Sequence, residues 1–324
     1  MSLKTAFSCA FVVLVSFSLF FVSLSCDDNG NNPTTVEGPD GPEDPEWVGN
    51  FKVTLRKDID EEGNIISSSV NIVGAAADGP ALSNMSWDTV MTDGDCYLIE
   101  PRQHYCEDPC GIGKVCVGEN TCKAEPKRMD IGEITVDGIK TTENTTTFSL
   151  GDRTPYMPIE EMVFPPFDDG AQITFSVAGN SEINPFTITG KGIAPIELKN
   201  DTIRYEDSTE ITLEWEKSKL GHASIFFEID ISYHGGTKAR IVGETDDDGS
   251  YTISAKILDK LKSYGVAGFP RLIIYRRATF KNKAGNVNLI IESEEMRYLQ
   301  IPGLISCNGY CPDGKTCGAD RVCR

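Results

Sequence analysis

The sequence predicts an all-β protein with two small cysteine modules and one short helix. Apolar and polar residues alternate in segments such as Ile211–Glu216 and Ile225–Ser232, and turn sequences such as Asp248 followed by Gly249 lie between segments. A period of two is typical of strands that bury one face. Short strands at this spacing predict two β-sandwich-like domains of the immunoglobulin or fibronectin-III kind.

The predicted strands and turns divide the chain into five segments. These are a signal peptide (1–25), an acidic proline-rich tether (26–47), an N-terminal β domain (48–198) with a cysteine module inserted at 106–122, a C-terminal β-sandwich (199–302) and a C-terminal cysteine module (303–324). In the first β domain, 51–55 and 69–73 form a predicted hairpin. The one convincing helix is 255–263, which has three apolar residues on one face.

One cysteine spacing occurs twice, with intervals of three, five and five residues. The two quartets are Cys106, Cys110, Cys116 and Cys122, and Cys307, Cys311, Cys317 and Cys323. This coincidence indicates an internal repeat, and each module is too short to form a core without crosslinks. Four cysteines also suit a zinc site, but an exported chain favours disulfides. The pairing within each quartet stays open among three connectivities.

The N-terminal segment predicts export and a membrane anchor. Lys4 precedes an apolar run from Ala6 to Leu24, and small residues lead to Cys26. This arrangement is typical of a secretory signal. A cysteine at the cleavage site followed by a polar stretch resembles a bacterial lipoprotein, in which the thiol is diacylated. Ser23 stands where that family usually has leucine, so a plain secreted protein and a retained membrane helix are the alternatives.

Cysteine parity connects Cys26 with Cys96. If Cys26 is acylated and both quartets pair internally, Cys96 is left as a free or intermolecular thiol. If Cys26 is not acylated, all ten cysteines beyond the signal could pair. Cys96 could also pair with Cys106 and leave another member of the first quartet free.

Charge and motif context exclude two classes of partner. The formal net charge of −19 at pH 7 argues against nucleic-acid binding, which needs a basic surface. Gly309 and the later run Gly314–Thr316 match the phosphate-binding loop pattern, but Cys311 and Cys317 fall in and beside the match. A turn in a disulfide module lacks the strand and helix that make such a loop work. We therefore expect no nucleic acid, nucleotide or other cofactor.

Motifs for metal binding or catalysis are few. Glu244, Asp246 and Asp248 before Gly249 resemble the start of a calcium loop, although Ala255 stands where the closing glutamate belongs. A plain β-turn is the alternative. The three histidines lack paired metal-ligand spacing, and there is no nucleophile elbow. We therefore predict no catalytic residues.

Five short motifs occur along the chain. They are Gly94–Leu98, Cys110–Cys116, Gly192–Pro195, His234–Gly236 and Gly265–Pro270. Together they resemble a family of uncharacterised cysteine-rich bacterial envelope lipoproteins, over most of residues 50–324. The resemblance implies an envelope lipoprotein with β domains, and it carries no functional residues over to this chain.

The expected function is that of a lipid-anchored cell-envelope protein with a structural, adhesive or ligand-binding role. Its expected partners are the membrane, through the anchor, and an envelope protein or polysaccharide. Two alternatives are a secreted or envelope enzyme that acts on extracellular polymers, and a calcium-stabilised adhesion module. The sequence leaves open the ligand, the choice between inner and outer membrane, and the oligomeric state.

Overall fold

A computed structural model describes residues 47–59, 64–152, 154–307, 310–312 and 314–324. The strands are β1 (Val48–Ile59), β2 (Ile65–Ala77), β3 (Met85–Asp93), β4 (Cys96–Gln103), β5 (Lys114–Gly118), β6 (Thr121–Ala124), β7 (Ile134–Asp137), β8 (Thr147–Ser149), β9 (Gln172–Val177), β10 (Phe186–Lys191), β11 (Ile203–Arg204), β12 (Ile211–Glu214), β13 (Ser224–Asp230), β14 (Arg240–Asp246), β15 (Ser250–Ile253), β16 (Arg271–Lys281) and β17 (Val287–Gln300), and the helix is α1 (Ala255–Lys262). The all-β prediction is confirmed.

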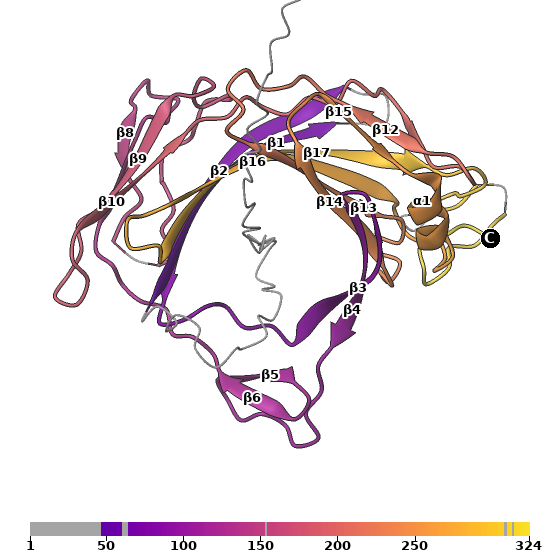
Figure 1. The fold of residues 1–324 in the computed structure, drawn as a ribbon, viewed down its shortest axis with the longest axis horizontal. Helices are drawn as coiled ribbons and strands as arrows, with labels where there is room; N and C mark the ends of the chain where they lie inside the picture. The colour runs from indigo at the N-terminus through magenta and orange to yellow at the C-terminus, as the bar shows by residue number, and fades with distance from the viewer. Residues whose placement is uncertain (1–46, 60–63, 153, 308–309, 313) are drawn as a thin grey trace, which may run out of the picture.

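One nine-stranded sheet runs through the molecule. Its order is β2-β1-β17-β16-β13-β14-β4-β3, and the short β11 pairs with the end of β17. Neighbouring strands are antiparallel except at β1–β17 and β11–β17, which are parallel. Figure 1 shows the sheet bent into an arch, with β2 near one end, β3 near the other, and the β5–β6 pair below the opening between them.

The alternation along each strand gives the arch an outer and an inner face. In β1, Phe51, Val53 and Leu55 are fully buried on the outer face, whereas Lys52 and Thr54 point to the inner face and are partly exposed. Successive side chains of a strand point to opposite faces, so one alternating segment supplies both surfaces. β1 and β2 form the predicted hairpin.

Two layers cover the outer face and enclose two hydrophobic cores (Figure 1). The four-stranded sheet β10-β9-β7-β8 closes the first core, where the ring of Phe175 stacks on Phe51 with centroids 5.2 Å apart. The β12–β15 pair and α1 close the second core around Trp215, Phe227 and Leu258. The outer face is therefore the structural face, and the inner face is the one that the two layers do not cover.

The predicted helix is present as α1. Ser254 caps its first turn, since its side chain accepts a hydrogen bond from the Ile257 N–H. Ile257, Leu258 and Leu261 are its buried residues, as the sequence pattern predicted. With eight residues, α1 is far shorter than a membrane span, and no helix in the described part of the chain is both long and apolar enough to cross a bilayer.

The predicted division into separate sandwiches at 48–198 and 199–302 differs from the structure. Strands from both segments share the large sheet, because β1 pairs with β17 and β4 pairs with β14. A period of two identifies the buried face of a strand, but it does not identify the neighbouring strand. The boundary near residue 198 therefore marks a change of core along one sheet.

Both cysteine quartets form disulfides, which confirms that part of the prediction. The bonds are Cys106–Cys116, Cys110–Cys122, Cys307–Cys317 and Cys311–Cys323. The first cysteine of each module pairs with the third, and the second pairs with the fourth. Because these thiols are consumed, the modules are crosslinked turns, and an oxidising compartment suits them better than the cytosol.

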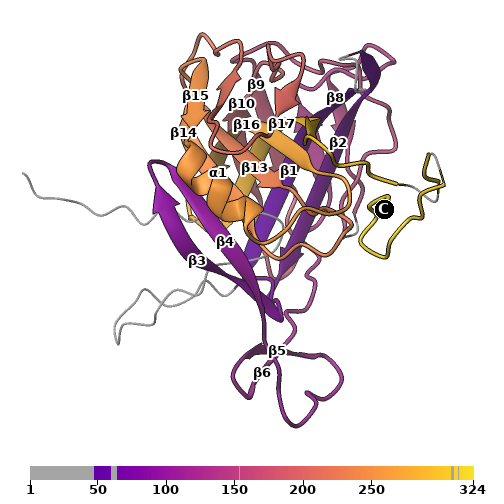
Figure 2. The same cartoon turned by 90° about the vertical axis from the view of Figure 1, so that its right-hand side faces the viewer.

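The two modules attach to the body in different ways. The first is inserted between β4 and β7, and Figure 2 shows β5–β6 projecting from the rest of the molecule. At its base, the Lys127 N–H donates to Oδ1 of Asp78 at 2.6 Å, close to the end of β2. The C-terminal module lies against the body, since the Gly268 N–H donates to the carbonyl of Asp320 at 2.7 Å and Cys307 is buried.

Candidate functional site

The inner face of the large sheet is the main candidate for a functional surface. Side chains directly opposite each other on neighbouring strands share a face, and the register places Arg277 opposite Glu292 and Tyr275 opposite Glu294. The described inner-face residues used below are Lys52, Thr54, Arg56, Trp87, Tyr97, Phe226, Glu228, Arg240, Arg271, Tyr275, Arg277, Glu292 and Glu294. All of them except Thr54 are charged or aromatic, and aliphatic residues such as Val242 and Ile273 share the face with them.

A pocket of about 180 Å³ lies on the inner face over β1, β2, β16 and β17. Nζ of Lys52 is 2.7 Å from Glu292, and the Arg277 guanidinium is 3.0 Å from the same carboxylate. Arg56 lies 3.3 Å from Glu294. The floor of this pocket is thus an array of alternating positive and negative groups.

The two glutamates of this pocket are in different environments. The side chain of Glu292 is only 1% exposed and is tied to Lys52, Thr54 and Arg277. Glu294 has 20% of its side chain exposed, and burial raises its pKa although Arg56 acts in the opposite direction. Glycoside hydrolysis in most families uses two carboxylates that reach the substrate. This pocket offers one accessible carboxylate, so its geometry favours binding over that reaction.

A second part of the inner face is built from arginines that stack on aromatic rings. The Arg240 guanidinium lies 3.8 Å from the ring centre of Trp87, and that of Arg271 lies 3.3 Å from the ring centre of Tyr233. Glu228 lies between the two arginines, 2.7 Å from Arg240 and 4.0 Å from Arg271. Stacking on a ring fixes a guanidinium and leaves its edge available for planar polar groups.

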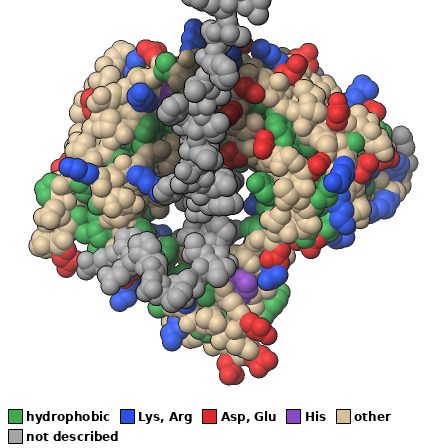
Figure 3. Space-filling view, in the orientation of Figure 1, with side chains coloured by type: hydrophobic (Ala, Val, Ile, Leu, Met, Phe, Trp, Pro, Cys, Tyr) green, Lys and Arg blue, Asp and Glu red, His purple; other side chains and the backbone are tan. Residues whose placement is uncertain are grey.

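Three buried N–H groups in this second part have no hydrogen-bond partner among the described residues. They are Nε1 of Trp87, Nε of Arg240 and Nε of Arg271. Buried donors are nearly always paired in folded proteins, so unpaired ones call for a specific explanation. Figure 3 shows acidic and basic side chains interspersed on the side of the molecule drawn in Figure 1. A mixed surface of this kind suits a polar partner that both donates and accepts hydrogen bonds.

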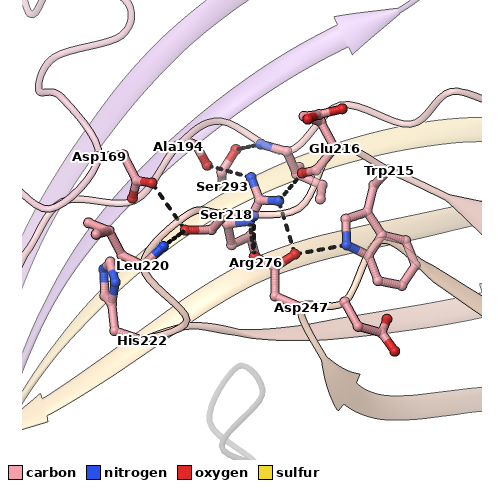
Figure 4. Close-up of polar contacts among 12 residues, drawn as sticks. Asp169, Ala194, Trp215, Glu216, Ser218, Leu220, His222, Asp247, Arg276 and Ser293 are labelled. Atoms are coloured by element: carbon pink, nitrogen blue, oxygen red, sulfur yellow. Dashed lines mark hydrogen bonds and ion pairs between the residues drawn. The ribbon is translucent and has the colours of Figure 1, made fainter.

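The structure also contains a buried polar cluster between the two cores, centred on Arg276 (Figure 4). The guanidinium donates from Nε and one terminal nitrogen to Asp247, and from its terminal nitrogens to the carbonyls of Ala194, Pro195 and Glu216. These bonds use the five N–H groups that an arginine has. The cluster is therefore saturated by the protein, and its role is to hold loops of the outer layer against β16.

Arg276 and Asp247 were not identified from the sequence, although the alternation around Arg276 indicated a buried charge. Along β16, Leu272, Ile274 and Ala278 occupy the buried face, and Arg276 falls in the same alternation. A charged residue that falls on the buried side of a strand needs a buried partner. Asp247 gave no such signal, because it lies in a turn between acidic neighbours.

Cys96 is free and buried on β4, with 1% of its surface exposed. Its sulfur lies 3.6 Å from the hydroxyl of Tyr251. Burial is the main cause that raises the pKa of this thiol to about 11. Of the other predicted positions, the eight module cysteines form the disulfides given above, and Cys26 lies outside the described residues.

The weak calcium candidates are spread over a strand and a turn. Glu244 and Asp246 lie on β14, and Asp248 lies in the following turn, where its Oδ1 accepts from the Ser250 N–H at 3.4 Å. Among the described residues, close groups of three or more metal-ligating side chains occur only at the cysteine modules. The turn reading explains Asp248, and calcium binding stays a prediction.

Comparisons with known proteins give no family assignment. The chain matches no protein-family model, and no curated protein matches its sequence. The resemblance to cysteine-rich envelope lipoproteins therefore stays a prediction, and the functional argument depends on the geometry of the chain itself.

Proposed function

We propose that this protein is a lipid-anchored cell-envelope protein that binds an envelope partner through the inner face of its curved sheet. The observation that supports binding most directly is the mixed set of charged and aromatic side chains on that face. The pairs Lys52–Glu292 and Arg240–Glu228 hold these groups in place. Groups that are already fixed lose little entropy when a partner binds.

Cysteine pairing supports the lipid anchor. Eight of the cysteines beyond the signal segment are in disulfides, and Cys96 is enclosed in the second core. A buried thiol with a raised pKa reacts poorly with another cysteine. Cys26 is then the odd cysteine, which fits acylation better than pairing within the chain.

Intact mass spectrometry of the protein isolated from membranes tests the anchor. We expect the mature chain to begin at Cys26, to carry the mass of acyl chains and four disulfides, and to release one alkylatable thiol only after unfolding. Cys26→Ser should abolish the added mass and the membrane association. A mature chain with an unmodified or disulfide-bonded Cys26 would overturn the anchor.

Binding to fractionated envelope material tests the inner face. Purified polysaccharide and solubilised envelope proteins are applied separately to the immobilised protein. We expect one fraction to bind, and Tyr97→Ala and Arg56→Ala to weaken this binding about tenfold, because the two residues lie on the inner face and are well exposed. The control is Tyr310→Ala, which alters an exposed tyrosine of the C-terminal module. Equal binding by all of these variants would contradict the proposed surface.

A further inference from the structure

A second pocket lies at the end of β17, beside the C-terminal module, and shares no lining residue with the inner-face pocket. Its volume is about 480 Å³, within the range of roughly 300–1,000 Å³ typical of small-molecule sites. It forms where β17 changes partner, since β1 pairs with β17 as far as Glu295 and β11 pairs with it from Leu299. Arg297 and Tyr298 lie in this interval and line the pocket.

The guanidinium of Arg297 is bonded to Glu295, and one of its hydrogen-bond donors remains unpaired. Its Nε donates to Oε1 of Glu295 at 2.8 Å, and Glu295 is buried. One terminal nitrogen of the same guanidinium is buried and has no hydrogen-bond partner in the described part of the chain. A buried donor that stays unpaired costs about 1–3 kcal/mol, and more when it is charged. A small rotation of the guanidinium toward a bound acceptor would remove this penalty.

Four further polar residues line the pocket. These are Asp201, Thr202, Gln300 and Ser306, and none of them makes a side-chain hydrogen bond to another described residue. Together with Arg297 they provide a carboxylate, an amide, two hydroxyls and a guanidinium. This set can both donate to and accept from a ligand that carries several hydroxyl groups.

Aromatic rings complete the lining. Tyr298 is 43% exposed, and Phe269 contributes a partly buried ring. A sugar ring presents hydroxyls at its rim and C–H groups on its faces, so it is recognised by planar polar side chains beside an aromatic ring. The pocket combines both kinds of group, and Leu304 and Ser306 bring the start of the C-terminal module into its wall.

The charges of the pocket distinguish between neutral and acidic ligands. Glu295 offsets the charge of Arg297 through their ion pair, and Asp201 then leaves the site with an excess negative charge. The whole chain adds a net charge of −19. Carboxylated or sulfated sugars would be repelled by this field.

We propose that this pocket binds a neutral saccharide. In the bound state, Arg297 donates to a ring or hydroxyl oxygen, Asp201 accepts from hydroxyl groups, and the ring of Tyr298 packs on a C–H face of the sugar. By register Tyr298 lies opposite Arg271 and faces the inner side, whereas Arg297 lies opposite Leu272 and faces the outer side. The pocket therefore opens along β17 in the interval between β1 and β11, and it shares no lining residue with the pocket of Lys52 and Glu294. It adds a second binding site to the proposed function.

Ligand-observed NMR and calorimetry with the purified full-length protein test this site. The probes are maltohexaose, cellohexaose and mannohexaose, with oligogalacturonate as the acidic comparison. We expect one or more neutral probes to bind and oligogalacturonate to bind at least tenfold more weakly. Tyr298→Ala and Asp201→Ala should each weaken binding about tenfold or more. Both residues are exposed, so unchanged thermal unfolding can be verified for each variant.

Tyr105→Ala is the matched control, because Tyr105 is 72% exposed and lines neither pocket. It should bind the neutral probe like the unaltered protein. The proposal is overturned if no neutral probe binds at millimolar concentration, or if oligogalacturonate binds most tightly. It is also overturned if Tyr97→Ala abolishes binding while Tyr298→Ala does not, and that result would assign the saccharide to the part of the inner face around Tyr97 instead.

Discussion

Arg276 and Asp247 form an ion pair that is sealed between the two cores, with Nε of Arg276 2.7 Å from Oδ2 of Asp247 and both side chains at most 2% exposed. Asp247 also accepts from Nε1 of Trp215 at 2.8 Å and from the Ser218 N–H at 3.1 Å. This pair therefore connects β16 to the turn after β14 and to the segment after β12. It fixes the outer layer where the two cores meet.

Removing one partner of this pair should strongly destabilise the protein. We expect Arg276→Met to lower the free energy of unfolding by about 3–5 kcal/mol, because Asp247 would remain buried without its counter-charge. Urea denaturation monitored by tryptophan fluorescence measures the change. Arg102→Met is the control, since the Arg102–Asp88 pair is 63% and 38% exposed and should contribute no more than about 1 kcal/mol. Similar losses in the two variants would contradict the role assigned to Arg276.

The two cysteine modules should respond differently to loss of a disulfide. Neither hydrophobic core contains a residue of 106–122, so Cys106→Ser with Cys116→Ser should speed hydrogen exchange in that module and leave global unfolding unchanged. Cys307 is buried and its module bonds to Gly268. We therefore expect Cys307→Ser with Cys317→Ser to lower global stability by about 2–3 kcal/mol. A global loss from the first pair as large as that from the second would show that the projecting module supports the body.

Alternation along the strands was sufficient to identify much of the second core, including Ile225, Phe227 and Ile229. It could not predict that β1 pairs in parallel with β17, since these strands are far apart in the chain and alternation specifies a face without naming a neighbour. The inner face was missed for the same reason. In the sequence, Lys52 and Arg277 each occupy a position typical of a solvent-exposed side chain. Only the strand register brings both of them to Glu292.

The disulfide connectivity could not be predicted from the sequence either. Three pairings satisfy each quartet, and the choice depends on how the turns place the Cβ atoms. Cys116 and Cys122 face each other across the β5–β6 pair, yet each bonds to a cysteine from the preceding loop. The two modules nevertheless share one connectivity, first to third and second to fourth, in agreement with the internal repeat that the spacing indicated.

Cys96 should be unreactive in the folded protein and should make stability depend on alkaline pH. Iodoacetamide at pH 8 is expected to label it only after unfolding, because the thiol is buried with a pKa raised to about 11. The unfolded thiol loses its proton near its ordinary value of 9.0 while the folded one retains it. Stability should therefore fall as the pH rises from about 9 to about 11. Cys96→Ala should show a smaller fall over this interval, and an identical fall would contradict the assignment.

Neutralising Glu294 and neutralising Asp58 should change the stability of the protein in opposite directions, although both residues contact Arg56. Burial raises the pKa of Glu294, so its folded carboxyl binds a proton more tightly than the unfolded one. Its favourable contribution is present below the unfolded pKa and is lost as the pH rises through the folded pKa. Glu294→Gln should therefore be more stable than the unaltered protein at pH 7, and this gain should disappear below about pH 4.5.

For Asp58, hydrogen bonds from Arg56 and Ser67 lower the pKa. Its contribution is present above the unfolded pKa and is lost as the pH falls through the folded pKa, so Asp58→Asn should be less stable than the unaltered protein at pH 7. Denaturation at pH 7 and pH 4, with a carboxyl ¹³C titration of Glu294, measures both effects. A loss of stability in Glu294→Gln at pH 7 would contradict this prediction. It would mean that the attraction of Arg56 for the Glu294 carboxylate outweighs the cost of burying it, and that the inner-face pocket is more hydrated than its geometry indicates.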